Sequence, residues 1–129
     1  HVIHRRQRQM CIRDRGMVID KNNNANLSYG VMGGQYQPVG QVHVLNNMID
    51  YGMGPQEALS FPRAFHFNNI YKLEKTVDKE IFHGLKEVGH KVEYIDGTHG
   101  GGQAIKINRS EGDLLGGSDP RKDGYAKGY

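Results

Sequence analysis

The 129-residue sequence contains a single cysteine, Cys11, no tryptophan, four prolines and no long apolar run. One cysteine excludes an internal disulfide framework and says little about the redox compartment. No stretch approaches the roughly 18–20 consecutive apolar residues that cross a bilayer, so we expect no membrane span. An apolar fraction of 36% and a charged fraction of 24% are typical of a globular protein with a modest core.

Positive charge is concentrated at the start of the chain. The formal net charge is +3, but residues 1–15 contain five arginines and one aspartate, a net of +4, which leaves −1 for the other 114 residues. An arginine-rich arm can bind phosphate backbones, but the rest of the chain has no basic stripe, so we expect no nucleic-acid partner. The segment also lacks the apolar centre of a secretory signal. We expect residues 1–15 to be a non-native or disordered basic leader and residues 16–129 to form the fold.

Familiar catalytic and metal-binding patterns are missing. The histidines outside the leader show no HxH or HExxH spacing and no cysteine partner, so we expect hydrogen-bonded or surface histidines and no metal site; they are His43, His66, His83, His90 and His99. No serine lies in a GxSxG motif, and Thr76 and Thr98 are internal, so neither is an N-terminal nucleophile. The glycine-rich stretch 97–103 lacks the Lys-Ser/Thr of a phosphate-binding loop, which favours a flexible or tightly packed loop and no cofactor.

Alternating and helical periodicities predict an α+β fold with antiparallel hairpins and flanking helices. One helix is expected to begin at Pro38 and to end at Gly52 and Gly54, and a short one covers 55–60, stopped by Pro62. A further helix is expected over 79–88, with Asp78 as its N-cap. The strands are expected within a hairpin over 17–32, in 70–77 and 91–95, and in a hairpin over 103–119. The apolar positions expected to face the core from the first helix are Val42, Leu45, Met48, Ile49 and Met53.

Two adjacent glycines, Gly33 and Gly34, stand between the first predicted hairpin and the first predicted helix. A tight strand-to-helix turn is one explanation for the pair. The other is chemical, because successive backbone N–H groups without β-carbons can approach and stabilise a developing oxyanion. Spacing alone leaves both explanations open.

Several stretches occur in a familiar order: GVMGGQYQP, IDYGMGPQEALSFPRAF, LKEVGHKV, GGGQAI and GGSDPRKDGYAKGY. Together they resemble the C-terminal part of the small subunit of the γ-glutamyltransferase family, over about residues 17–129. The combination of PQEA…PR with the terminal SDPR and GY is its most specific part. The resemblance implies an N-terminal nucleophile hydrolase with a four-layer αββα sandwich, of which this chain provides a part.

The resemblance also implies a reaction and its residues. A precursor of this family cuts itself, and the new N-terminal threonine attacks a γ-glutamyl amide such as glutathione. The acyl group then passes to water, an amino acid or a peptide. Gly33 and Gly34 match the family's oxyanion-hole glycines, and Asp119 and Arg121 match the SDPR motif, where we expect a structural ion pair or turn. No cofactor is implied.

The sequence departs from the family in two ways. The nucleophilic threonine and the groups that bind both ends of the glutamyl moiety are expected N-terminal to this sequence. We therefore expect a fragment that is inactive alone and whose partners are the large subunit and the N-terminal part of the small subunit. Many members also have Pro-Gly-Gly where this chain has Met32-Gly33-Gly34, which resembles a divergent acylase-like branch.

Two alternatives remain open at this stage: an acylase acting on another amide, such as a glutaryl or cephalosporin side chain, and a non-catalytic interaction domain. The sequence itself assigns no compartment. The resemblance suggests a periplasmic or extracellular protein and is compatible with a cytoplasmic one.

Overall fold

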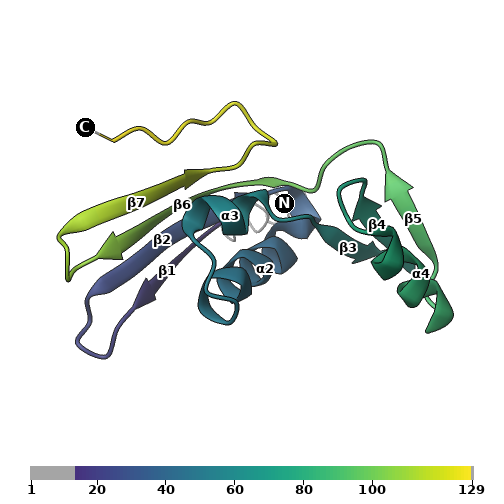
Figure 1. Cartoon of the computed structure of the whole chain (residues 1–129), viewed down its shortest axis with the longest axis horizontal. Coiled ribbons are helices and arrows are strands. Elements are labelled where there is room, and N and C mark those ends of the chain that lie inside the picture. The colour runs from purple at the N-terminus through teal and green to yellow at the C-terminus, as the bar shows by residue number, and fades with distance from the viewer. Residues whose placement is uncertain (1–13, 129) are drawn as a thin grey trace, which may run out of the picture. The chain divides into compact units, whose positions relative to one another are not determined.

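The computed structural model describes residues 14–128, which form two compact units (Figure 1). Unit 1 comprises residues up to Ser60 together with those from Gly100 onward, and unit 2 comprises Phe61–His99. Nearly all of the predicted basic leader lies outside the described residues. The described element order confirms the predicted α+β class, with helices flanking antiparallel strands.

Unit 1 is built on a four-stranded antiparallel sheet in the order β1-β2-β6-β7. Its strands are β1 (Arg15–Ile19), β2 (Ala25–Met32), β6 (Gly101–Asn108) and β7 (Asp113–Ser118). Both predicted hairpins are therefore confirmed. The sheet begins earlier than expected, at Arg15, because pairing depends on backbone groups: the Asp14 carbonyl accepts a hydrogen bond from Val31 N–H at 2.8 Å.

Two helices cover one face of this sheet, as Figure 1 shows. A 3₁₀ turn, η1 (Gly34–Tyr36), leads into α2 (Gln37–Ile49), and α3 (Pro55–Ser60) follows. Apolar side chains from the sheet and the helices are buried here; they include Leu27, Val31, Val44, Met48, Ala58, Leu59 and Ala104. Burying this apolar surface is the main favourable contribution to the stability of the unit.

The predicted core face of α2 is partly wrong. Met48 is buried as expected, but Val42 and Ile49 are 57% and 61% exposed. Val44 faces the core instead, and Gly40 lets the helix approach the sheet, since a Cβ there would lie 2.7 Å from Val31 Cγ1. The helix carries apolar residues on two sides, and only one side meets the sheet.

The opposite face of the sheet is rich in exposed apolar side chains. Those more than 45% exposed are Met17, Ile19, Met32, Ile105 and Leu114. The segment after β7 runs along part of this face, where a Cβ on Gly101 would overlap Lys122 and one on Gly116 would lie 3.2 Å from Ala126 Cβ. In a sandwich of two packed sheets, such a face is the one that meets the second sheet.

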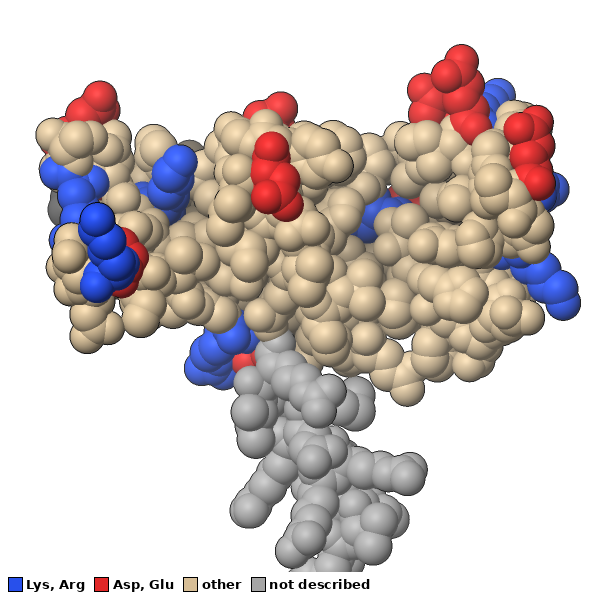
Figure 2. All heavy atoms as spheres, turned by 90° about the horizontal axis from the view of Figure 1, so that it is seen from below, with Lys and Arg blue, Asp and Glu red and all other residues tan. Residues whose placement is uncertain are grey.

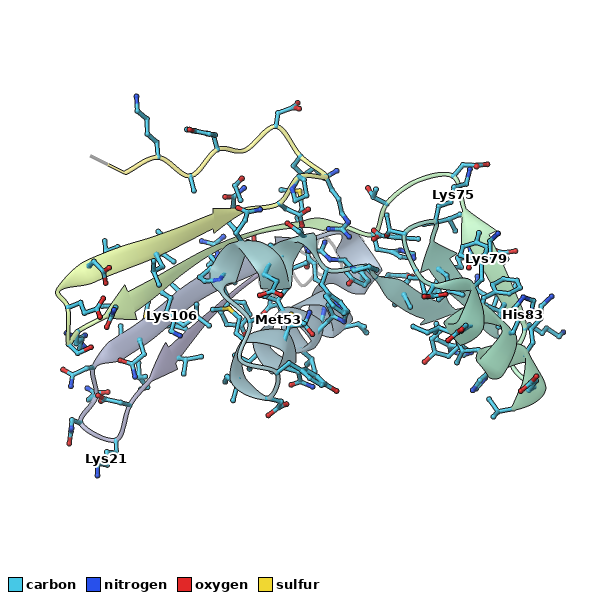
Figure 3. The ribbon with its side chains drawn as sticks, viewed as in Figure 1. Lys21, Met53, Lys75, Lys79, His83 and Lys106 are labelled. Carbon is cyan, nitrogen blue, oxygen red and sulfur yellow. The ribbon has the colours of Figure 1, made fainter. Side chains whose placement is uncertain are left out.

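The turn between β1 and β2 depends on the ionised side chain of Asp20, with Lys21 at its tip (Figure 3). Asp20 Oδ1 accepts hydrogen bonds from the backbone N–H groups of Asn22 at 2.8 Å and Asn24 at 2.9 Å. These bonds, chiefly the one from Asn24, lower the pKa of Asp20 below its ordinary value of 3.8.

This arrangement predicts that the turn weakens in acid. Because the folded pKa is lowered, the stabilisation is complete above the unfolded value and is lost as the pH falls through the folded one. We expect the Asn24 amide proton to lose its protection, relative to intrinsic exchange, only below pH 3.8. Asp20→Asn should remove this acid-dependent step, and protection that stays constant in the unmodified chain would contradict the prediction.

Unit 2 is a small three-stranded sheet in the order β3-β4-β5 with one helix. Its elements are β3 (Ala64–Phe67), β4 (Ile70–Glu74), α4 (Lys79–Glu87) and β5 (Val92–Ile95). Helix α4 is confirmed, including its N-cap: the Asp78 side chain accepts a hydrogen bond from Glu80 N–H at 3.1 Å. Pairing of β4 with β5 is parallel, since α4 carries the chain back to the starting edge.

Strand β3 was not predicted. It forms a hairpin with β4 through Asn68 and Asn69, whose φ angles are +51° and +62°. Consecutive asparagines with positive φ are typical of a tight two-residue hairpin turn, so this dipeptide was the available signal.

A buried polar cluster closes unit 2. The Glu74 carboxylate accepts hydrogen bonds from the backbone N–H groups of Arg63 at 3.0 Å and His99 at 2.8 Å. Arg63, which is fully buried, donates from Nη1 to the His99 carbonyl at 2.8 Å. The first and last parts of the unit are thereby fastened to β4.

Charged side chains are dispersed on the face of the described residues seen in Figure 2, where Lys and Arg groups lie among acidic and uncharged residues. None of the helices within residues 14–128 combines the length and the apolar composition of a membrane span.

Candidate active site

The glycine pair lies where β2 ends and η1 begins. Gly33 has φ 132° and ψ 27°, and Gly34 has φ 59°. Both φ angles lie in the region that side chains disfavour, so the backbone conformation favours glycine at both positions, most strongly at Gly33. Gly33 is exposed and Gly34 is half-buried, so the turn is not enclosed by the core.

The carbonyl groups of the pair are hydrogen-bonded within the turn. Tyr36 N–H donates to the Gly33 carbonyl at 3.1 Å, and Gln37 N–H donates to the Gly34 carbonyl. Neither the Gly33 N–H nor the Gly34 N–H donates a hydrogen bond to another residue of the described part. Two neighbouring donors are therefore available on an accessible turn.

The motifs that carry the resemblance meet in unit 1. The Gln56 side chain makes two hydrogen bonds with the backbone of Ser118, to its carbonyl at 2.8 Å and from its N–H at 3.0 Å. The two segments approach so closely that a Cβ on Gly117 would lie 2.8 Å from Gln56 N. PQEA and GGSDPR, far apart in the sequence, thus form one contact between α3 and β7.

The expected ion pair of the SDPR motif is confirmed. Asp119 is fully buried, and its Oδ1 lies 3.2 Å from Arg121 Nη1. Asp119 Oδ2 accepts a hydrogen bond from Gly102 N–H at 2.9 Å, and Arg121 Nη1 donates to the Leu59 carbonyl at 2.9 Å. The pair fastens the ends of β7 and α3 to the start of β6.

The remaining candidates of the sequence analysis are histidines and threonines at other positions in the sequence. His99 is buried and hydrogen-bonded, as expected, with Nε2 2.8 Å from the Lys72 carbonyl. His66, His83 and His90 are exposed; His83 is labelled on α4 in Figure 3. No group of three or more histidine, cysteine, aspartate or glutamate side chains within residues 14–128 is arranged to hold a metal ion. Thr76 and Thr98 are exposed residues of unit 2.

Comparison with known protein families shows which family this chain belongs to. The sequence profile described as Gamma-glutamyltranspeptidase matches residues 3–129. The chain belongs to the γ-glutamyltranspeptidase family. The match confirms the resemblance drawn from the motifs, and it includes most of the arginine-rich segment that the sequence analysis placed outside the fold.

Individual relatives agree with this family. The chain is 37% identical over 121 residues to the glutathione hydrolase-like YwrD proenzyme of Bacillus subtilis, covering 86% of this chain and 23% of the relative. It is 34% identical over 116 residues to the oxamate amidohydrolase proenzyme of Klebsiella pneumoniae, covering 84% and 22%. The chain therefore spans less than a quarter of the length of these relatives.

A similar protein of known structure identifies the fold. The cephalosporin acylase of Bacillus halodurans superposes with a TM-score of 0.77 at 37% identity, over 84% of this chain and 22% of the acylase. The fold of this γ-glutamyltranspeptidase-family chain is thus that of the N-terminal nucleophile hydrolases, as the motifs implied.

Proposed function

We propose that this chain provides the oxyanion hole of an enzyme that cleaves γ-glutamyl amides through a threonine acyl-enzyme. The observation that carries the proposal is the pair of unengaged N–H donors, Gly33 and Gly34, on an accessible turn of a family member. Glutathione is the expected type of substrate, with water, an amino acid or a peptide as the acceptor.

The backbone geometry supports this role in three ways. Both glycines lack a side chain that would obstruct a substrate carbonyl. Their carbonyls are tied to η1 and α2, so the turn is held while the donors face no competing acceptor of the described residues. Donors fixed before the reaction stabilise the tetrahedral intermediate without reorganising, and one such donor typically contributes about 10²–10³ in rate.

The remaining parts of the reaction require other segments. An attacking threonine, whose own amino group takes the hydroxyl proton and passes it to the leaving amine, would break the amide C–N bond and form the acyl-enzyme, and water or an acceptor amine would then release the acyl group. The chain spans only 23% of the YwrD proenzyme. We propose that the large subunit and the N-terminal part of the small subunit supply these groups, and that the chain alone is inactive.

A specific observation favours a second candidate, an acylase. The Bacillus halodurans cephalosporin acylase is as similar in sequence, at 37%, as the glutathione hydrolase-like relative. Met32 also precedes the glycine pair where many γ-glutamyl enzymes have proline. Both candidates use the same oxyanion hole and differ in the group that the acyl pocket accepts.

Two matched anilides separate these candidates. γ-Glutamyl and glutaryl 4-nitroanilide differ only in the α-amino group, so a site that binds this amine should favour the first by roughly 10²-fold or more in kcat/KM. The measurement uses the full-length protein and follows nitroaniline release. Preference for the glutaryl compound would select the acylase, and no turnover of either would favour an interaction domain. Turnover by residues 1–129 alone, abolished by a change at Gly33, would contradict the proposed division of roles.

A further inference from the structure

Gly100, immediately before β6, is a residue of unit 1 that the proposed chemistry has not used. Its φ angle is +60°, in the left-handed region. A Cβ at this position would overlap the Met32 carbonyl oxygen and lie 2.9 Å from Tyr36 Cδ1. The conformation therefore disfavours a side chain, and the surroundings leave no room for one.

The contact with the glycine pair is direct. A Cβ built on Gly33 would lie 2.9 Å from Gly100 Cα and 3.4 Å from Gly100 N. The backbones of the two glycines are thus in contact, with no room for a side-chain atom between them. Met32 and Gly101 are paired residues of β2 and β6, so this contact continues the sheet by one step beyond its last pair.

Tyr36 completes the support from the helix side. It is 3% exposed, and its N–H closes the turn onto the Gly33 carbonyl. A Cβ on Gly40 would lie 2.6 Å from Tyr36 Cε1, so the ring is held between Gly40 and Gly100. The turn that carries the proposed donors is therefore fixed by β6 on one side and by the Tyr36 ring on the other.

We propose that Gly100 is a positioning residue, whose contact with Gly33 and Tyr36 holds the N–H groups of Gly33 and Gly34 in the direction that oxyanion binding requires. This inference rests on the proposed function. An added methyl group at Gly100 must displace the Met32 carbonyl or the Tyr36 ring, both of which adjoin the turn. Oxyanion donors act over a narrow range of distances, and a misplacement of about 1 Å can cost roughly 10²-fold in rate.

The test compares three glycine-to-alanine variants of the full-length protein. Gly100→Ala adds strain and a steric overlap. Gly112→Ala adds comparable backbone strain, since φ is +76°, but no neighbour lies within 4 Å. Gly97→Ala also has open space and no positive φ. Self-cleavage is followed on denaturing gels, so that kinetics are compared only among processed proteins.

We expect Gly100→Ala to lower kcat for the γ-glutamyl anilide by about 10²-fold, with KM within roughly threefold of the unmodified value. Affinity for a γ-glutamyl boronate, which forms a tetrahedral adduct, should fall in parallel with kcat, whereas affinity for glutamate should not. Gly112→Ala and Gly97→Ala should match the unmodified enzyme. A kcat for Gly100→Ala equal to theirs, or a loss seen equally in glutamate affinity, would overturn the inference.

If Gly100→Ala does not fold, a second pair of variants tests the proposed positioning role. Tyr36→Leu removes the ring that supports Gly100, and Tyr36→Phe retains it. We expect the leucine variant to lose roughly tenfold more kcat and boronate affinity than the phenylalanine variant. Equal values would overturn the inference. Failure of the proposed function is separate: it appears as an unmodified protein that turns over no amide substrate.

Discussion

Replacing Asp119 by alanine is expected to lower the free energy of unfolding by about 3–5 kcal/mol, the usual result of removing one partner of a buried ion pair. Asp119 is fully buried, and the Arg121 side chain is 7% exposed. The substitution removes the carboxylate that accepts a hydrogen bond from Arg121 Nη1 and that also accepts one from Gly102 N–H. It also releases the junction of β6, β7 and α3, since Arg121 links Asp119 to the Leu59 carbonyl.

Equilibrium urea unfolding of the full-length protein measures this effect, with Asp123→Ala as the matched control. Asp123 is an exposed aspartate four residues further along the chain, and its removal should change stability by no more than about 0.5 kcal/mol. Equal midpoints for the two variants would show that the SDPR ion pair does not hold the sheet and α3 together.

Removing one N–H group of the glycine pair is expected to reduce kcat by about 10²–10³-fold. An alanine at Gly33 does not isolate this effect, since its Cβ would lie 2.9 Å from Gly100 Cα and its φ would be strained. A backbone ester avoids both problems. Glycolate in place of Gly34 converts the amide between Gly33 and Gly34 into an ester, which deletes one donor and adds no side chain.

Local patterns predicted most of the elements. The Asp78 cap with its apolar spacing located α4, and glycine and asparagine turns located both hairpins of the four-stranded sheet. These features depend on neighbours a few residues away, so they can be read from the sequence. The short strand β3 was missed because its four residues, Ala64–Phe67, are too few to give a clear periodicity.

Features that depend on distant contacts could not be predicted in the same way. The apolar spacing on α2 did not show which of its apolar residues face the sheet. Val44 is buried, whereas Val42 and Ile49 are exposed. The orientation of the helix depends on the close approach of Gly40 to β2, which the spacing does not reveal. The candidate site likewise has one part that the sequence indicated and one part that only the structure revealed. The resemblance indicated Gly33 and Gly34, whereas the support from Gly100 emerged only from the pairing of β2 with β6.

The hydrogen bonds between the Gln56 side chain and the Ser118 backbone are another feature that could not be predicted. These residues belong to two motifs of the resemblance, yet nothing in either motif indicates that the amide of one binds the backbone of the other. Such hydrogen bonds are long-range, and they join the motifs PQEA and GGSDPR in unit 1.

The most direct measurement is the single-turnover rate of the full-length protein with glycolate at position 34, with glycolate at position 97 as the control ester. Because Gly34 N–H donates to no acceptor of the described residues, stability should match the control within about 0.5 kcal/mol. Acylation by the γ-glutamyl anilide should be about 10²–10³-fold slower at position 34. Equal acylation rates for the two esters would contradict the oxyanion role of this turn.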